Sequence, residues 1–285
     1  MVGGRNPVAE QRRLRAELRR LRNSAGLTQK QVATALEWSL SKVIRIEGGT
    51  VGLSITDLKA LLDLYGVTSQ EQIDDLSAAA RASREKAWWD AFRGHASPQL
   101  IEYIAVEASA STLSEYQTFI VPGILQTTAY IRALGEEFGF DDDGTERAIA
   151  MRTERRRLLT GEHPLEARFV LDEMVIRRAI GSPGTMREQL DFLKELNRLP
   201  TVSIQVATSD RRVTRWMQSP FTIFELPDQD HHVYVDQPGC TLIARTNPDE
   251  VGRYLDAFEQ LQEPAHSSPA AELDVVIDQI AKQQA

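Results

Sequence analysis

Polar and cationic side chains between Ser39 and Arg45 fall on the outer side of one short predicted helix. At 3.6 residues per turn, Val43 and Ile46 share the inner, apolar side of this helix. The outer residues are Leu40, Ser41, Lys42 and Arg45. Hydroxyl, ammonium and guanidinium groups donate hydrogen bonds to base edges and to phosphate oxygens. The chemistry that this segment offers is therefore non-covalent recognition of a nucleic acid.

Two helices precede this segment and position it. Leucines at 14, 18 and 21, with Ala25, predict a first helix over about 8–25 that ends at Gly26. Thr28 stands three residues before Gln31, which is the capping-box pattern that begins a second helix of about two turns. Ser39 caps the third helix and, at its start, is also expected to contact DNA.

Only Glu37 and Trp38 join the second and third predicted helices, so the two must cross steeply. This is the helix-turn-helix arrangement. In that geometry the start of the third helix enters the major groove of DNA, and the amino end of the second lies near a phosphate. We therefore expect Thr28 and Gln29 to hold the DNA backbone. Further caps at Ser54 and Ser69 begin a fourth and a fifth helix.

The segment LRRLRNSAGLTQKQVATALEWSLSKVIRIEGGT resembles the Cro/CI-type (xenobiotic-response-element-like) transcriptional regulators. The resemblance implies a lambda-repressor-like DNA-binding domain, in which an ion pair between Arg22 and Glu47 ties the first helix to the end of the recognition helix. Two residues depart from the family pattern. Leu40 replaces a frequent glutamine, which favours contact with a thymine methyl group. Glu37 replaces the glycine common in the turn, where a positive φ is expected. The alternative is a helical bundle whose arginines are merely solvated.

Charge is distributed unevenly along the chain. The net charge is −8, with 33 lysines and arginines against 41 acidic residues. Residues 1–66 carry 11 basic and 6 acidic side chains, a net +5, which leaves −13 for residues 67–285. A basic amino-terminal region on an acidic body indicates that only the first part meets an anionic partner.

The remainder of the chain predicts a second domain, and the fold class is α+β. An all-α domain of five helices over 1–86 is followed by a larger mixed α/β domain over 87–285 that has a small sheet. Alternating segments at 168–172, 202–206, 221–226, 232–236 and 241–244 predict the strands. Predicted helices lie at about 100–109, 123–134, 145–159, 186–199, from 248 to 261, and at 270–282.

This second region resembles the largely uncharacterised carboxy-terminal domain that follows such DNA-binding domains in regulators of high-GC Gram-positive bacteria. The matching segments include KAWWDAF, FVLDEMVIRRAIG and PFTIFELPD. Those regulators are described as antitoxin-like and are often paired with a small protein encoded next door. The resemblance therefore implies a protein partner as well as DNA.

Several residue groups in the second region could bind a ligand, a metal ion or DNA, and each also has a purely structural interpretation. Trp88 and Trp89 could stack on a ligand, but an interdomain seam is favoured. The run at 141–144 lacks the ligand spacing of a calcium loop and is interpreted as a helix cap. His231 and His232 are adjacent on a strand and point to opposite faces, and His95, His163 and His266 have no ligand-spaced companion. The arginines at 152, 155, 156 and 157 could touch DNA, although a solvated face is favoured.

No motif in the sequence predicts an enzyme. Asp172 and Glu173 are adjacent carboxylates at a strand end and are the weak catalytic candidate. The sequence has no Gly-x-Ser-x-Gly, phosphate-loop or dinucleotide motif. Cys240 is the only cysteine, which excludes an internal disulfide and a multi-cysteine zinc site.

Together these observations predict a sequence-specific transcriptional regulator without cofactor or metal, which binds a palindromic operator as a homodimer and acts in the cytoplasm. Its carboxy-terminal domain would dimerise and receive a small-molecule or protein signal. Two alternatives stay open: an antitoxin-like protein that neutralises a small partner and autoregulates by DNA binding, and an enzyme with a regulatory head.

Overall fold

The computed structural model describes residues 7–48, 53–161, 164–227, 230–237, 241–245 and 247–284. The chain divides into two compact units, Met1–Ala91 and Phe92–Ala285, which are called the head and the body below. The boundary expected after residue 86 lies between the last helix of the head, which ends at Ala82, and the 3-10 helix η1 at Trp88–Phe92.

The described part of the head contains five α-helices, as the sequence predicts. They are α1 (Pro7–Ser24), α2 (Gln29–Ala35), α3 (Leu40–Gly48), α4 (Ile55–Leu64) and α5 (Gln70–Ala82). The predicted caps begin three of them. The Thr28 hydroxyl accepts from the N–H of Gln31, and Ser54 and Ser69 cap α4 and α5 in the same way. The helices enclose a core that includes the buried side chains of Leu18, Val32, Val43, Leu58 and Leu62.

The turn between α2 and α3 keeps the left-handed geometry that glycine normally provides. Glu37 has φ 55° and is the one non-glycine residue with positive φ in the described part of the chain. A left-handed residue with a Cβ atom costs roughly 1–2 kcal/mol. The sharp turn is therefore formed despite the glutamate, because the helices on either side share one core.

The body is built on a six-stranded mixed sheet in the order β3-β2-β1-β4-β5-β6. The strands are β1 (Thr112–Gln117), β2 (Glu166–Asp172), β3 (Val202–Ala207), β4 (Phe221–Glu225), β5 (His231–Gln237) and β6 (Thr241–Arg245). The first three run parallel, with Tyr116 beside Val170, whereas β4, β5 and β6 follow as antiparallel neighbours. Five of these strands match the predicted segments.

The central strand, β1, lies outside the segments that the sequence predicts as strands. Its side chains from Leu113 to Gln117 are buried, because β1 is paired on both sides and covered on both faces. Glu115 and Gln117 occupy positions where apolar residues are expected in such a strand, so the apolar alternation that marks a strand is broken.

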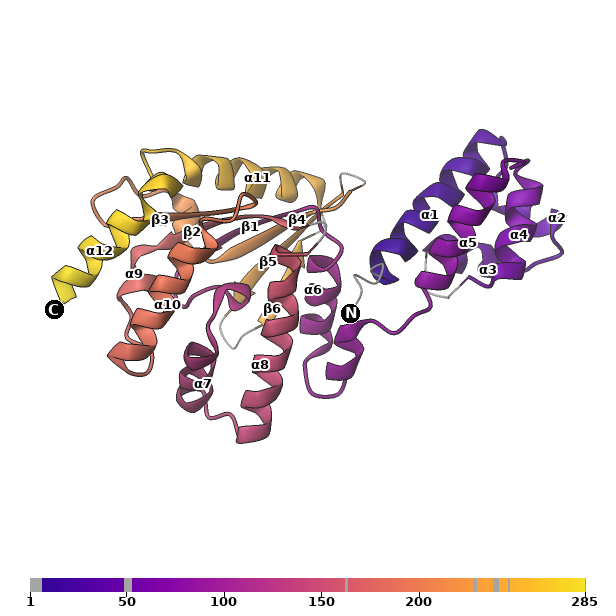
Figure 1. Ribbon diagram of the computed structural model, residues 1–285. Coiled ribbons are helices and arrows are strands. Elements are labelled where there is room, and N and C mark those ends of the chain that lie inside the picture. The colour runs from indigo at the N-terminus through magenta and orange to yellow at the C-terminus, as the bar shows by residue number, and fades with distance from the viewer. Residues whose placement is uncertain are drawn as a thin grey trace. The chain divides into compact units, whose positions relative to one another are not determined.

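Helices cover both faces of the sheet (Figure 1). α11 (Pro248–Gln262) lies on one face, where Phe258 packs against Phe221. The opposite face carries α6 (Pro98–Glu107), whose Tyr103 ring lies 5.0 Å from that of Phe224 and 5.1 Å from that of Tyr234, between ring centroids. Further helices on this side are α7 (Thr128–Glu137), α8 (Asp142–Arg156) and α10 (Pro183–Leu196).

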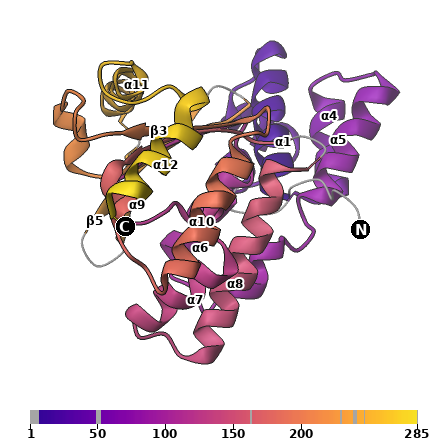
Figure 2. The ribbon, with the colours of Figure 1, turned by 60° about the vertical axis from the view of Figure 1, so that its left-hand side comes forward.

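The remaining elements are short or lie at the β3 edge. α9 (Glu173–Arg177) directly follows β2, and α12 (Leu273–Gln284) lies alongside α10 (Figure 2). Single 3-10 turns are η2 (Gly123–Leu125), η3 (Arg157–Leu159), η4 (Arg215–Gln218) and η5 (Ala270–Glu272). No described helix is long and apolar enough to span a membrane.

Candidate functional site

The outer face of α3 presents the candidate DNA-reading side chains. Val43 and Ile46 are buried in the head core, as the helical period predicts. Leu40 is 42% exposed, and Ser41 and Arg45 are also exposed. Ser39 begins the helix by accepting a hydrogen bond from the N–H of Lys42 at 3.2 Å. The helix is thus fixed from inside while its other face meets solvent.

Ile44 belongs to this face, although the sequence analysis did not select it. Its side chain is 48% exposed and stands one helical turn after Leu40. The signal was available in the sequence, because residues four apart share a helix face. Exposed aliphatic groups at both positions suit contact with thymine methyl groups in a major groove.

Glu47 anchors the end of α3 to the other two helices of the motif. Its carboxylate Oε1 lies 2.7 Å from Arg22 Nε, which is the ion pair that the family resemblance implies. Its Oε2 accepts a hydrogen bond of 2.8 Å from Gln29 Nε2. Arg19 also donates to the Glu47 main-chain carbonyl. Because Glu47 is only 2% exposed, this network fixes α1, α2 and α3 relative to one another.

The side chains of Thr28 and Gln29 make bonds within the head. The Thr28 hydroxyl accepts from the Gln31 N–H and donates to Gln31 Oε1, and the Gln29 amide donates to Glu47. We expected both residues to hold the DNA backbone. In the structure both side chains fix the start of α2, a helix of 7 residues, against the rest of the motif, and their contact with the DNA backbone stays a prediction.

Lys42 lies between two partners inside the head. Its Nζ is 2.8 Å from Asp57 Oδ1 and 3.7 Å from the centre of the Trp38 ring. This geometry ties α3 to α4, and the contact of Lys42 with DNA stays a prediction. Arg45 donates to the Ser41 carbonyl at 3.2 Å and stays exposed. The most exposed side chains on this face of α3 are those of Leu40, Ser41, Ile44 and Arg45.

The body's candidate carboxylates make structural bonds. Asp172 caps α9 by accepting from the N–H of Met174 at 2.8 Å. Glu173 is desolvated, but the Ser209 N–H and the Arg177 guanidinium outweigh that effect and lower its pKa. A cavity of about 330 Å³ lies beside them. A lowered pKa disfavours Glu173 as a general acid.

The arginines at 152, 155, 156 and 157 do not form one solvated face as predicted, because Arg155 is buried and Arg152 and Arg156 are partly buried. Arg155 forms a two-point ion pair with Glu107, with bonds of 2.6 and 2.7 Å. Burial disfavours the charged guanidinium, but Glu107 outweighs it and raises the pKa of Arg155. Burial and the neighbouring Arg155 lower the pKa of Arg152 to about 10. Arg157, at the start of η3, is the exposed member of the four, whereas Arg156 lies over the Phe192 ring of α10.

Two acids of the sheet lie close to one amide: the buried Glu115 of β1 and the partly buried Asp236 of β5. Gln117 Nε2 lies between Glu115 Oε1, at 3.4 Å, and Asp236 Oδ2, at 3.3 Å. Burial, reinforced by the charge of Asp236, raises the pKa of Glu115 to about 8. Burial also raises the pKa of Asp236, although Gln117 opposes it. Glu115 is thus largely protonated at neutral pH.

The described residues contain no group of three or more histidine, cysteine or acidic side chains that could hold a metal. Asp141 caps α8 through the N–H of Gly144, as predicted for that run. His231 and His232 lie on β5. Trp89 is buried and meets Trp88 edge-on, with centroids 5.4 Å apart. His163 and Cys240 lie outside the described residues.

Comparison with known protein families gives two matches. Residues 13–76 match the family described as Helix-turn-helix domain, and these residues include the whole of α2 and α3. Residues 100–272, more than half of the chain, match the family described as Domain of unknown function (DUF5753). Searches of curated proteins and of solved structures found no match.

Proposed function

This chain belongs to the DUF5753 family and carries a helix-turn-helix domain ahead of the family's domain, and on that premise we propose that it is a sequence-specific DNA-binding transcriptional regulator. The observation that carries the proposal is the outer face of α3, where Leu40, Ser41, Ile44 and Arg45 are exposed on a helix held rigidly from behind. In this function α3 enters the major groove, and Arg45 reaches a guanine edge or a phosphate.

Support for a Cro/CI-type head comes from the network around Glu47. Reading DNA requires that the recognition helix keep its position while it contacts the groove. The buried carboxylate of Glu47 provides this by bonding Arg22 from α1 and Gln29 from α2. Desolvation and the Glu47 charge also raise the pKa of Tyr65 to about 12, so this phenol stays neutral beside the network.

Ser41→Glu tests the proposed reading face directly. Ser41 is exposed, so the substitution adds a negative charge without filling the core, and this charge would face the DNA phosphates and base edges. We expect electrophoretic mobility shifts on the fragment upstream of the gene to be lost. Val275→Glu adds the same charge at an exposed position of α12 and serves as the matched control. Equal binding by both variants would refute the placement of α3 on DNA.

We further propose that the protein acts as a homodimer on a palindromic operator, with the body forming the dimer. A single recognition helix reads few base pairs, and paired heads read half-sites about one helical turn apart. Sedimentation analysis should show a dimer. A monomer that binds the operator tightly would contradict this arrangement.

The antitoxin-like function is a second candidate, favoured by exposed apolar side chains at one edge of the body's sheet. Phe119, Met174 and Val213 follow the carboxyl ends of β1, β2 and β3, and Val213 is 85% exposed. Contiguous exposed apolar groups are typical of protein-docking surfaces. A small protein encoded beside the gene should then co-purify with the chain and be lost with Val213→Glu. Co-purification that Val213→Glu leaves unchanged would contradict docking at this edge.

We propose that the body acts by binding rather than by catalysis, and that the protein works in the cytoplasm, where its DNA target lies. The support is the use of both carboxylate candidates: Asp172 as a helix cap and Glu173 in a bond to Arg177. Both carboxylates thus already make bonds that hold the body together.

A further inference from the structure

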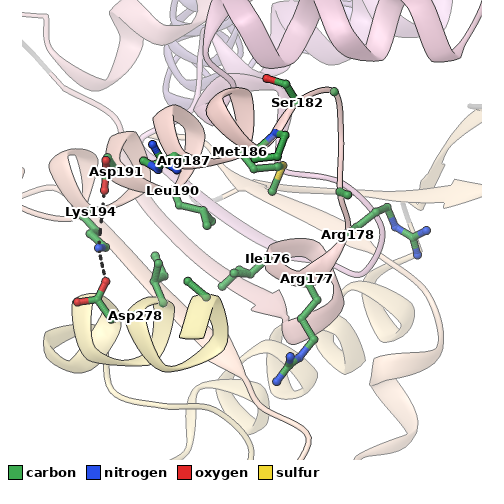
Figure 3. Close-up of a pocket in the computed structure, with 15 residues that line it drawn as sticks. Ile176, Arg177, Arg178, Ser182, Met186, Arg187, Leu190, Asp191, Lys194 and Asp278 are labelled. Carbon is green, nitrogen blue, oxygen red and sulfur yellow. Dashed lines mark hydrogen bonds and ion pairs between the residues drawn. The ribbon is translucent and has the colours of Figure 1, made fainter. Parts of the chain in front are cut away.

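A cavity of about 710 Å³ lies between α9, α10 and α12 in the body (Figure 3). Small-molecule sites in proteins have volumes of roughly 300–1,000 Å³. The cavity is thus large enough for a ligand with ten or more carbon atoms. The DNA-binding proposal gives it no role.

The cavity opens where the described residues of α10 and α12 are no longer linked by ion pairs. α10 and α12 run antiparallel, and Lys194 Nζ lies 2.7 Å from Asp278 Oδ1, while Arg198 reaches Asp274 at 3.0 Å. Lys194 lies in the carboxyl half of α10, and Arg198 lies just beyond the end of that helix. No described ion pair links its amino half, around Met186, to α12, and this is where the space opens.

The floor of the cavity is apolar. Ile176 from α9, Met186 and Leu190 from α10, and Ile277 from α12 line it. Figure 3 shows Met186, Leu190 and Ile176 converging from α10 and α9. Ile176 and Ile277 are almost fully buried, whereas Met186 is half-exposed and can contact an incoming molecule. A hydrocarbon or aromatic group is the complement of such a floor.

The charged groups around the floor have a positive excess. Lys194 lies between the two lining acids, at 2.7 Å from Asp278 and 3.7 Å from Asp191. Arg178 and Arg187 also line the cavity, and neither has an acidic partner among the described residues. This sign is opposite to the net charge of −13 for residues 67–285. A local reversal of charge beside an apolar floor favours an anionic head group on an apolar ligand.

We propose that this cavity binds a small amphipathic carboxylate, whose apolar chain lies against Met186, Leu190 and Ile277 and whose carboxylate meets Arg187. The assignment concerns the body alone, so it holds or fails independently of DNA binding. If the protein regulates transcription, a ligand here would be the signal that the body receives.

Three ten-carbon probes that differ in charge test the proposal on the full chain: decanoate, decan-1-ol and decylammonium. Calorimetric titration should show saturable binding of one decanoate per chain, weaker binding of decan-1-ol, and the weakest binding of decylammonium. Arg187→Glu should weaken decanoate binding about fivefold, as expected for reversing one partly exposed charge, and leave decan-1-ol unchanged.

Met186→Trp should fill the cavity and reduce decanoate affinity at least about tenfold, because the apolar floor supplies most of the binding. Val275→Trp adds the same side chain on α12 at an exposed position outside the lining and serves as the control. Ala281→Trp fills the cavity from α12 and replaces Met186→Trp if that variant unfolds at a lower temperature.

Three results would overturn the proposal. The first is absence of decanoate binding to the wild type. The second is equal decanoate affinity in Met186→Trp and Val275→Trp, which would place the ligand elsewhere. The third is that no probe binds and Met186→Trp converts a dimer of the chain into monomers. The cavity would then be occupied by a second copy of the chain.

Discussion

Replacing Glu115 with glutamine tests how this buried acid of β1 affects stability. Burial and the charge of Asp236 raise the pKa of Glu115 from 4.5 to about 8. Between these pH values the folded protein keeps a proton that the unfolded chain releases. The stability from this group is therefore fully present below pH 4.5 and is lost as the pH rises toward 8. At 1.36 kcal/mol per pH unit, the span corresponds to a loss of about 5 kcal/mol.

Glutamine at position 115 keeps the size of the side chain and its acceptor for Gln117, but it has no proton to lose. We expect Glu115→Gln to match the wild type at pH 5 within about 1 kcal/mol and to exceed it by several kcal/mol at pH 8. The assay is urea unfolding followed by circular dichroism at pH 5, 6, 7 and 8. Glu225→Gln, at a half-exposed glutamate of β4, is the matched control and should follow the wild type. A constant difference between Glu115→Gln and the wild type across this range would refute the reasoning.

Three further predictions concern single side chains. Glu37→Gly removes a Cβ atom from a residue at φ 55°, which relieves strain but adds the entropy cost of glycine. The free energy of unfolding of the head should therefore rise by about 0.5 kcal/mol. A lower free energy of unfolding, measured by chemical denaturation, would contradict this. Arg155→Met leaves the carboxylate of Glu107, which is 1% exposed, without its partner. In the same assay the body should lose about 3–5 kcal/mol of stability. A loss below about 1 kcal/mol would mean that the ion pair is solvated. Arg45→Ala should weaken operator binding by about 1–3 kcal/mol if Arg45 contacts a base, or lower the salt slope of binding by about 1 if it contacts a phosphate. Lys42→Ala should mainly lower the melting temperature, because Lys42 bonds to Asp57. Anisotropy titrations and thermal unfolding of both variants decide between these roles.

The head was largely predictable from sequence because its signals are local. Capping residues at Thr28, Ser54 and Ser69 begin helices in the structure where the sequence places them. Apolar residues at helical spacing identified the core and, by exclusion, the outer face of α3. The pairing of Lys42 with Asp57 was not predictable, because it joins residues 15 positions apart on different helices.

The body was less predictable because its central features depend on distant partners. β1 was missed since Glu115 and Gln117 give it a polar pattern, and only its neighbours explain why such residues are buried. The burial of Arg155 likewise depends on Glu107, 48 residues earlier in the chain. The cavity beside α12 results from helix packing, which no local pattern in the sequence reports.

The central claim, that α3 makes this protein a sequence-specific DNA-binding regulator, is tested most directly by fluorescence anisotropy. The purified chain is titrated onto its own upstream fragment and onto a scrambled fragment at two salt concentrations. We predict tight binding to the upstream fragment, much weaker binding to the scrambled one, and loss of affinity at the higher salt as counterions compete for the phosphates. Equal and weak binding to both fragments would contradict the claim.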